Sequence, residues 1–211
     1  MMTRMKNNQT NRNNIVELSL LRYLFILVLV VSGAGYAQES KHSTDGTTGE
    51  YGVVVSSVGS VRNTSAILLG GRGGWIVSPT FAIGIAGYTL MNDVSARLPD
   101  TSGNRNMTMS YGGVDLQYTF AINDTWFLTF QELIGAGSIS HKESPYLNKK
   151  QYHDPFAVFE PSVSIEVGVT KIFRIGIGAS YREVEWLQSD LATRADLGGP
   201  SAFVSLKIGF L

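Results

Sequence analysis

The 211-residue sequence lacks cysteine altogether and has only three histidines and six prolines. Without cysteine the chain forms no disulfide, binds no metal through thiolates and offers no thiol for lipid attachment. Lysine and arginine number 17, and aspartate and glutamate also number 17. This balance leaves no basic excess of the kind that nucleic-acid binding requires. The composition therefore excludes a lipoprotein, a disulfide scaffold and a nucleic-acid-binding protein.

Long apolar runs are also absent, except near the start of the chain. Residues 24–31 (LFILVLVV) are apolar, follow a basic stretch and precede the small-x-small triplet Gly35-Tyr36-Ala37. This order predicts a signal peptide over residues 1–37, cleaved near Ala37. An uncleaved anchor is the alternative, but a membrane span needs about 20 apolar residues and Arg22 interrupts this one. Cleavage leaves 174 residues with 13 basic and 16 acidic side chains, a formal charge of −3.

The rest of the chain is built from short segments rich in glycine, valine, isoleucine and aromatic residues. Residues 38–49 are polar and predict a disordered lead-in. Eight strand-like segments follow, and most reach the roughly 9–11 residues that a tilted membrane strand needs. They cover residues 50–58, 64–77, 80–91, 106–121, 125–139, 156–170, 172–186 and 200–211.

The connections between these segments alternate in length. Those at 78–80, 122–124 and 170–172 are tight, whereas those at 92–105, 140–155 and 187–199 are long and polar. Outer-membrane barrels have short periplasmic turns and long extracellular loops. The pattern predicts that residues 50–211 form an all-β, eight-stranded antiparallel transmembrane β-barrel, with both chain ends on the tight-turn rim.

Alternation within the segments fits a wall with an apolar outside and a polar inside. In the sixth segment Ile165 points to the lipid and Ser164 to the interior. The fifth segment breaks the rule, because Glu132 shares a face with Trp126 and Phe130. A β-bulge near Gln131 that resets the phase, or a position of Glu132 near the headgroups, would account for it.

The same alternation sends charged side chains into the interior. An eight-stranded barrel is just wide enough for side chains to fill, and charges buried there must pair. We expect a structural salt-bridge plug, in which Arg72 and Arg174 pair with Glu166 and Asp115 and interior glycines make room for the arginines. A narrow ion path is the alternative. The predicted interior polar set is Arg72, Asp115, Gln117, Glu160, Glu166, Arg174, Arg182 and Lys207.

Aromatic residues gather beside the tight turns. Aromatic girdles mark the membrane interfaces of outer-membrane barrels, so these residues predict the periplasmic interface. The set is Trp75, Phe81, Phe120, Trp126, Phe173 and Phe210.

These features together resemble the small eight-stranded outer-membrane proteins of the OmpX and OmpA barrel type. Segments 69–76 (LGGRGGWI) and 173–178 (FRIGIG) are similar to stretches of an uncharacterised Bacteroidetes outer-membrane barrel group. The resemblance implies a fold and a location, but no chemistry. Members often end on an aromatic residue, whereas Phe210 is penultimate here.

The sequence offers little for catalysis. Lipid A deacylases of this architecture use a His-x-Ser pair, which none of His42, His141 and His153 forms. Loop 141–154 holds residue types that bind zinc, but at no recognised ligand spacing. We therefore expect a non-enzymatic monomer without cofactor. Its expected partners are outer-membrane lipid, the assembly machinery and an extracellular ligand reached through the long loops, with a channel or a lipid A-modifying enzyme as alternatives.

Overall fold

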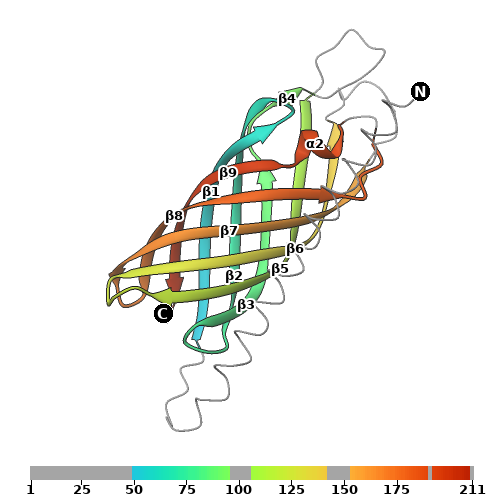
Figure 1. Ribbon diagram of the computed structural model, residues 1–211. Helices are drawn as coiled ribbons and strands as arrows, with labels where there is room; N and C mark the ends of the chain where they lie inside the picture. Colours follow the sequence, from blue (N-terminus) through green and yellow to red (C-terminus); the bar gives the residue numbers. More distant parts are fainter. Residues whose placement is uncertain (1–48, 96–105, 142–152, 190–191, 210–211) are drawn as a thin grey trace, which may run out of the picture. The chain divides into compact units, whose positions relative to one another are not determined.

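A computed structural model describes residues 49–95, 106–141, 153–189 and 192–209 (Figure 1). These residues belong to one unit that spans Thr47–Leu211. The predicted signal peptide and nearly all of the predicted lead-in lie outside the described residues. So do most of the loops 92–105 and 140–155. Within the described ranges, no helix has the length and apolar character needed to cross a membrane.

Eight long strands form the structure, and their positions follow the predicted segments closely. They are joined by a two-residue strand, β4 (Val94–Ser95), and a short helix, α2 (Arg194–Leu197). The long strands are β1 (Gly49–Val61), β2 (Thr64–Ile76), β3 (Phe81–Leu90), β5 (Asn106–Ala121), β6 (Trp126–His141), β7 (Asp154–Thr170), β8 (Phe173–Glu185) and β9 (Gly199–Gly209).

The strands close into a barrel. Each long strand pairs antiparallel with its neighbour in sequence, and β1 pairs with β9 from Tyr51↔Gly209 to Gly59↔Ser201. Strand β3 pairs with β2 on one side and with β5 on the other, and this last pairing closes the ring. Figure 1 shows the strands crossing the barrel at a steep tilt. The prediction of a closed eight-stranded antiparallel barrel is confirmed.

The first hairpin is tighter than the other connections on its rim. Strand β1 runs to Val61, so only Arg62 and Asn63 lie between it and β2. Both residues have positive φ, 53° and 56°. Positive φ at both central residues is the mark of a type I′ turn, whose twist matches that of the flanking strands. Asparagine tolerates this conformation better than most residues, so the local sequence suits the turn.

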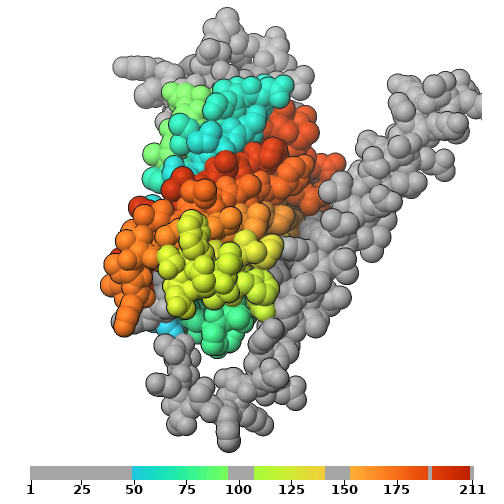
Figure 2. Space-filling model, turned by 60° about the vertical axis from the view of Figure 1, so that its left-hand side comes forward, coloured from blue at the N-terminus to red at the C-terminus, as the bar shows by residue number. Residues whose placement is uncertain are grey.

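The outer wall is apolar along the strands. Ile85 on β3 and Ile177 on β8 are 70% and 64% exposed, and valines, leucines and isoleucines of every long strand except β6 are exposed in the same way. In Figure 2 the side chains of β9, β8, β7 and β6 form adjacent bands across one face, coloured from red to yellow. So much exposed apolar surface on a closed sheet is unfavourable in water, and it suits a lipid environment.

The phase of β6 differs from one of our expectations. The ladders from β6 to β5 and β7 run without interruption through Gln131, so a bulge there is wrong. Glu132 stays on the outward side of β6, opposite Leu116 and Pro161, and is only 1% exposed. The register shift that the barrel does contain lies between Gly168 and Thr170, beside the β7–β8 turn.

The interior has an apolar half and a polar half. The apolar half lies toward the rim of long connections, where Leu68, Met107, Ile139 and Val158 are fully or almost fully buried. The polar half lies toward the tight turns and holds most of the buried charges. The barrel is therefore filled differently at its two ends.

Helix α2 lies at the rim of long connections and adds to the apolar half. Leu197 of this helix is completely buried in the hydrophobic cluster. Thr193 caps the helix by accepting from the Asp196 N–H, and the Asp196 carboxylate accepts from the Thr193 N–H, which completes a capping box. The Arg62 N–H donates to the Asp196 carbonyl over 2.8 Å, so the β1–β2 hairpin holds this segment in place.

Candidate functional site

The interior charges of the polar half form a connected cluster around Glu166. The Lys207 Nζ lies 3.5 Å from Glu166 Oε1, and the Arg174 Nη1 lies 3.8 Å from Glu166 Oε2. Arg174 and Lys207 stand directly opposite each other on β8 and β9. Like charges at opposed positions repel, and Glu166 on β7 is the carboxylate that offsets this repulsion. The expected pairing of Arg174 with Glu166 is present.

Asp115 has different partners from those expected. It accepts hydrogen bonds from the Tyr51 hydroxyl over 3.4 Å and from Gln117 Nε2 over 3.0 Å. The side-chain carbonyl of Gln117 in turn accepts from Lys207 Nζ over 3.0 Å. Gln117 therefore links Asp115 to the Glu166 cluster, and all of these side chains are buried.

Arg72 is held by neutral groups. Its Nε donates to the Tyr88 hydroxyl over 2.5 Å, and its Nη1 donates to Gln131 Oε1. Ser162 donates to the same Gln131 oxygen. Among the described residues, no carboxylate lies within ion-pair distance of Arg72, so its expected pairing with Glu166 or Asp115 is wrong. Arg72 and Asp115 do not pair because each already has other hydrogen-bond partners. Tyr51 and Gln117 surround Asp115, whereas Tyr88 and Gln131 bind the Arg72 guanidinium.

Arg182 and Glu160 meet through a tyrosine nearer the apolar half. The Tyr111 hydroxyl donates to Glu160 Oε2 over 2.6 Å and accepts from Arg182 Nη1 over 3.2 Å. Ser180 donates to the second oxygen of Glu160, and Arg182 Nε donates to the Leu197 carbonyl of α2. Arg182 is completely buried. This group therefore ties the charged interior to the helix that covers it.

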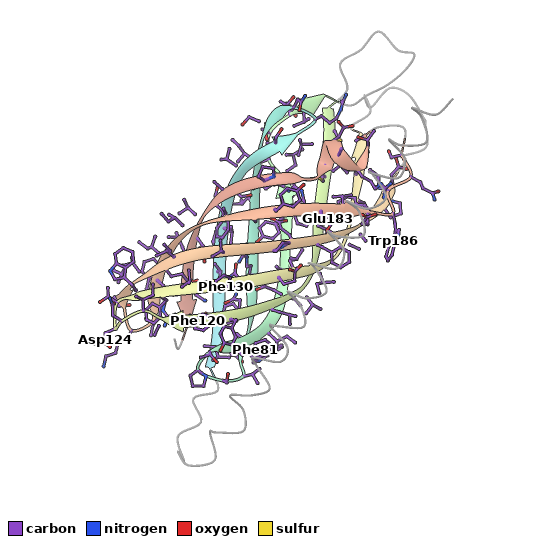
Figure 3. The ribbon with its side chains drawn as sticks, viewed as in Figure 1. Phe81, Phe120, Asp124, Phe130, Glu183 and Trp186 are labelled. Carbon is purple, nitrogen blue, oxygen red and sulfur yellow. The ribbon has the colours of Figure 1, made fainter. Side chains whose placement is uncertain are left out.

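The predicted girdle residues lie at the tight-turn ends of their strands. Trp75, Phe120 and Trp126 are exposed, whereas Phe81 and Phe173 are half-buried. Figure 3 shows Phe81 and Phe120 near the tight-turn end of the barrel and Trp186 at the opposite end. Trp186 is 80% exposed and was not predicted as an interface residue. Phe210 lies outside the described residues.

A cavity of about 350 Å³ opens at the mouth beside the tight turns. The Ser78–Thr80 turn and Phe81 form part of its wall, and Arg174 and Lys207 also line it. It is the place where the interior charges meet open space. Among the described residues, no three acidic, histidine or cysteine side chains come together as a metal site. Glu143 of the zinc candidate in loop 141–154 lies outside the described residues.

Sequence reasoning missed the tyrosines and glutamine that connect the charges. Tyr51, Tyr88 and Tyr111 each bond a charged side chain of the interior, and Gln131 bonds Arg72. Tyr111 lies four residues before Asp115 on one strand, so strict alternation would have placed it inside. The inward direction of Gln131 could not be predicted, because the sequence did not decide which side chains of β6 face the interior.

Searches against known proteins returned a likeness of fold alone. No family model and no curated protein matches the sequence. The structure is similar to Neisserial surface protein A, with a TM-score of 0.54 and 8% identity over 76% of this chain and 96% of that one. It is also similar to the N-terminal β-barrel domain of Pseudomonas aeruginosa OprF, with a TM-score of 0.51 and 11% identity over 79% and 100%. These likenesses support the barrel architecture, and the Bacteroidetes group stays a resemblance of sequence.

Proposed function

We propose that the protein is a non-enzymatic barrel of the bacterial outer membrane that acts through its rim of long connections. The observation that carries the proposal is the filled interior beneath an apolar outer wall. Leu68, Met107 and Leu197 are almost fully buried near the long connections, and a hydrogen-bonded charge network lies below them. A barrel packed in this way has its free surface in its loops rather than in its interior.

The apolar half argues against the channel alternative. An ion that crosses the barrel would have to pass the layer that contains Met107, Ile139 and Val158, whose apolar side chains cannot replace the water around it. Two charged groups near this layer, Arg182 and Glu160, are held by Tyr111, and Arg182 also donates to the Leu197 carbonyl of α2. Opening a path would break these bonds and expose the core.

The chemistry of the described interior also gives no reason to propose an enzyme. Acyl transfer by a serine needs a base within hydrogen-bond reach. Six serines are buried among the described residues, and the strands that carry them, β1, β7, β8 and β9, contain no histidine: these are Ser57, Ser162, Ser164, Ser180, Ser201 and Ser205. Two of them donate to Gln131 and Glu160 as parts of the packed network. Their hydroxyls therefore serve packing.

A loop-exchange experiment tests the proposal. Cells would produce the wild type, or variants in which residues 96–105 or 142–152 are replaced by Gly-Ser linkers of the same length. We expect these variants to insert as the wild type does and to lose binding of the cells to extracellular matrix or to abiotic surfaces. A change in the mass of lipid A on expression of the wild type would instead indicate lipid modification and contradict the proposal.

A further inference from the structure

The cavity at the tight-turn mouth has a chemical character of its own. Its inner wall carries Arg174, Lys207, Gln117 and Tyr51, and the side chains nearer the rim are mainly apolar. The apolar members are Ile76, Pro79, Phe81, Ala82, Ala121 and Phe127. A pocket with polar groups at its base and an apolar entrance suits an amphipathic ligand, with one polar end and one apolar end. The volume of about 350 Å³ falls within the range of small-molecule sites, roughly 300–1,000 Å³.

The base of this cavity has more positive than negative charge. Arg174 and Lys207 are opposed across β8 and β9, and both rely on the single carboxylate of Glu166. The other nearby carboxylate, Asp115, accepts from Tyr51 and Gln117 and pairs with no cation within 4.0 Å among the described residues. The third cation of this half, Arg72, is bonded to neutral groups. One further negative charge between Arg174 and Lys207 would relieve their repulsion.

The two cations retain donors for such an anion. Lys207 directs its ammonium toward Glu166 and Gln117, at 3.5 Å and 3.0 Å, and an ammonium has three protons to donate. Arg174 approaches Glu166 through Nη1 at 3.8 Å, and its guanidinium lies 3.6 Å from the centre of the Phe127 ring. Phe127 therefore packs against the guanidinium, and both residues line the cavity.

We propose that this mouth cavity binds a small amphipathic monoanion, a carboxylate attached to an aromatic or short aliphatic group. The carboxylate lies between Arg174 and Lys207, because charge-assisted hydrogen bonds to both cations are the strongest contacts available there. The apolar part packs against Ile76, Pro79 and Phe81 at the entrance. This inference does not depend on the function proposed for the loops.

Isothermal titration calorimetry tests the proposal, with the full-length protein refolded in zwitterionic micelles and benzoate as the probe. Titration of benzoate into empty micelles corrects for partition into detergent. Benzamide has nearly the same shape without the charge, and inorganic phosphate has charge without an apolar part. We expect benzoate to bind at least about tenfold more tightly than either, since a hydrogen bond to a charged group is worth that factor or more.

Three variants separate the site from general effects of charge. Arg174→Gln removes one cation from the cavity and should weaken benzoate binding by about tenfold or more. Arg194→Gln removes the same charge from an exposed position, where the Arg194 side chain is 60% exposed, and should leave binding unchanged. Ala82→Leu keeps both cations but fills the cavity, so it should also weaken binding.

Several results would overturn the proposal. These are the absence of benzoate binding by the wild type, equal affinity for benzamide or phosphate, and equal loss of affinity in Arg174→Gln and Arg194→Gln. Circular dichroism and heat-modifiable migration on gels would show whether each variant is folded before titration. If Arg174→Gln does not fold, the Ala82→Leu variant decides, and unchanged affinity there contradicts the cavity as the site.

Discussion

Replacing Glu166 by glutamine removes the carboxylate that Arg174 and Lys207 share while keeping the size of the side chain. In the wild type the two cations stand opposite each other, and Glu166 lies 3.8 Å and 3.5 Å from their nitrogens. The Lys207 and Arg174 side chains are only 6% and 11% exposed, so water screens their repulsion poorly. Glu166→Gln should therefore leave two buried like charges without a counter-ion.

The size of the effect follows from this burial. Removing one partner of a buried ion pair typically costs about 3–5 kcal/mol. Because Arg174 lines the mouth cavity and water can reach it there, we expect a loss near the lower end, about 3 kcal/mol. A second change, Lys207→Met, removes the repulsion, so the double variant should regain part of this loss. The cycle thus measures the coupling between residues on β7 and β9.

Urea-dependent folding into lipid vesicles, followed by tryptophan fluorescence, provides the measurement. Glu185→Gln is the matched control, because Glu185 pairs with Arg194 over 2.7 Å but at the exposed rim. Exposed pairs contribute about 0–1 kcal/mol, so this control should change the stability little. Equal costs for Glu166→Gln and Glu185→Gln, or additive effects of Glu166→Gln and Lys207→Met, would refute the network as described.

Three further predictions concern the wall and the core, and each compares two variants in the same folding assay. Ile165→Arg should destabilise the inserted barrel by about 2–4 kcal/mol more than Ser164→Arg, because Ile165 is 44% exposed on the wall and Ser164 is buried inside; equal costs would show that the register of β7 is wrong. Gly178→Ala should cost about 1–3 kcal/mol, since the added Cβ would lie 2.5 Å from the Phe203 ring, whereas Gly52→Ala meets nothing within 4 Å and should be nearly neutral. Tyr111→Phe should cost about 1–3 kcal/mol, because it removes the hydroxyl that links Arg182 to Glu160. Tyr181→Phe on the outer face should cost little, and a larger loss of stability in Tyr181→Phe than in Tyr111→Phe would contradict this link.

The fold was predictable because two simple periodicities fix it. Alternation of apolar and polar residues identified the strands, and the alternation of tight and long connections identified the barrel. The ends of β2 and β3 differ from expectation by one residue at most, since the turn Ser78-Pro79-Thr80 between them marks where both strands stop. The even number of strands predicted that both chain ends lie on the tight-turn rim.

The interior contacts were less predictable, because alternation gives a direction and no partner. It placed Arg72 and Asp115 inside, but their distance depends on the relative height of β2 and β5, which the sequence does not specify. Neutral groups such as Tyr88 and Gln131 compete for the same donors, and the expectation of paired charges overlooked them. Helix α2 escaped notice because four residues are too few to show a helical period, although Thr193 and Asp196 have the spacing of a capping box.

The central claim is that the barrel is closed and filled across its width, so that it inserts into a membrane without conducting. Planar-bilayer recording of the refolded protein tests this claim most directly, with insertion verified by protection from protease. We expect no steady ionic current at any applied voltage that the bilayer tolerates. Stable unitary currents from the inserted wild type would contradict it, because ions would then have crossed the layer of Leu68, Met107, Ile139 and Val158.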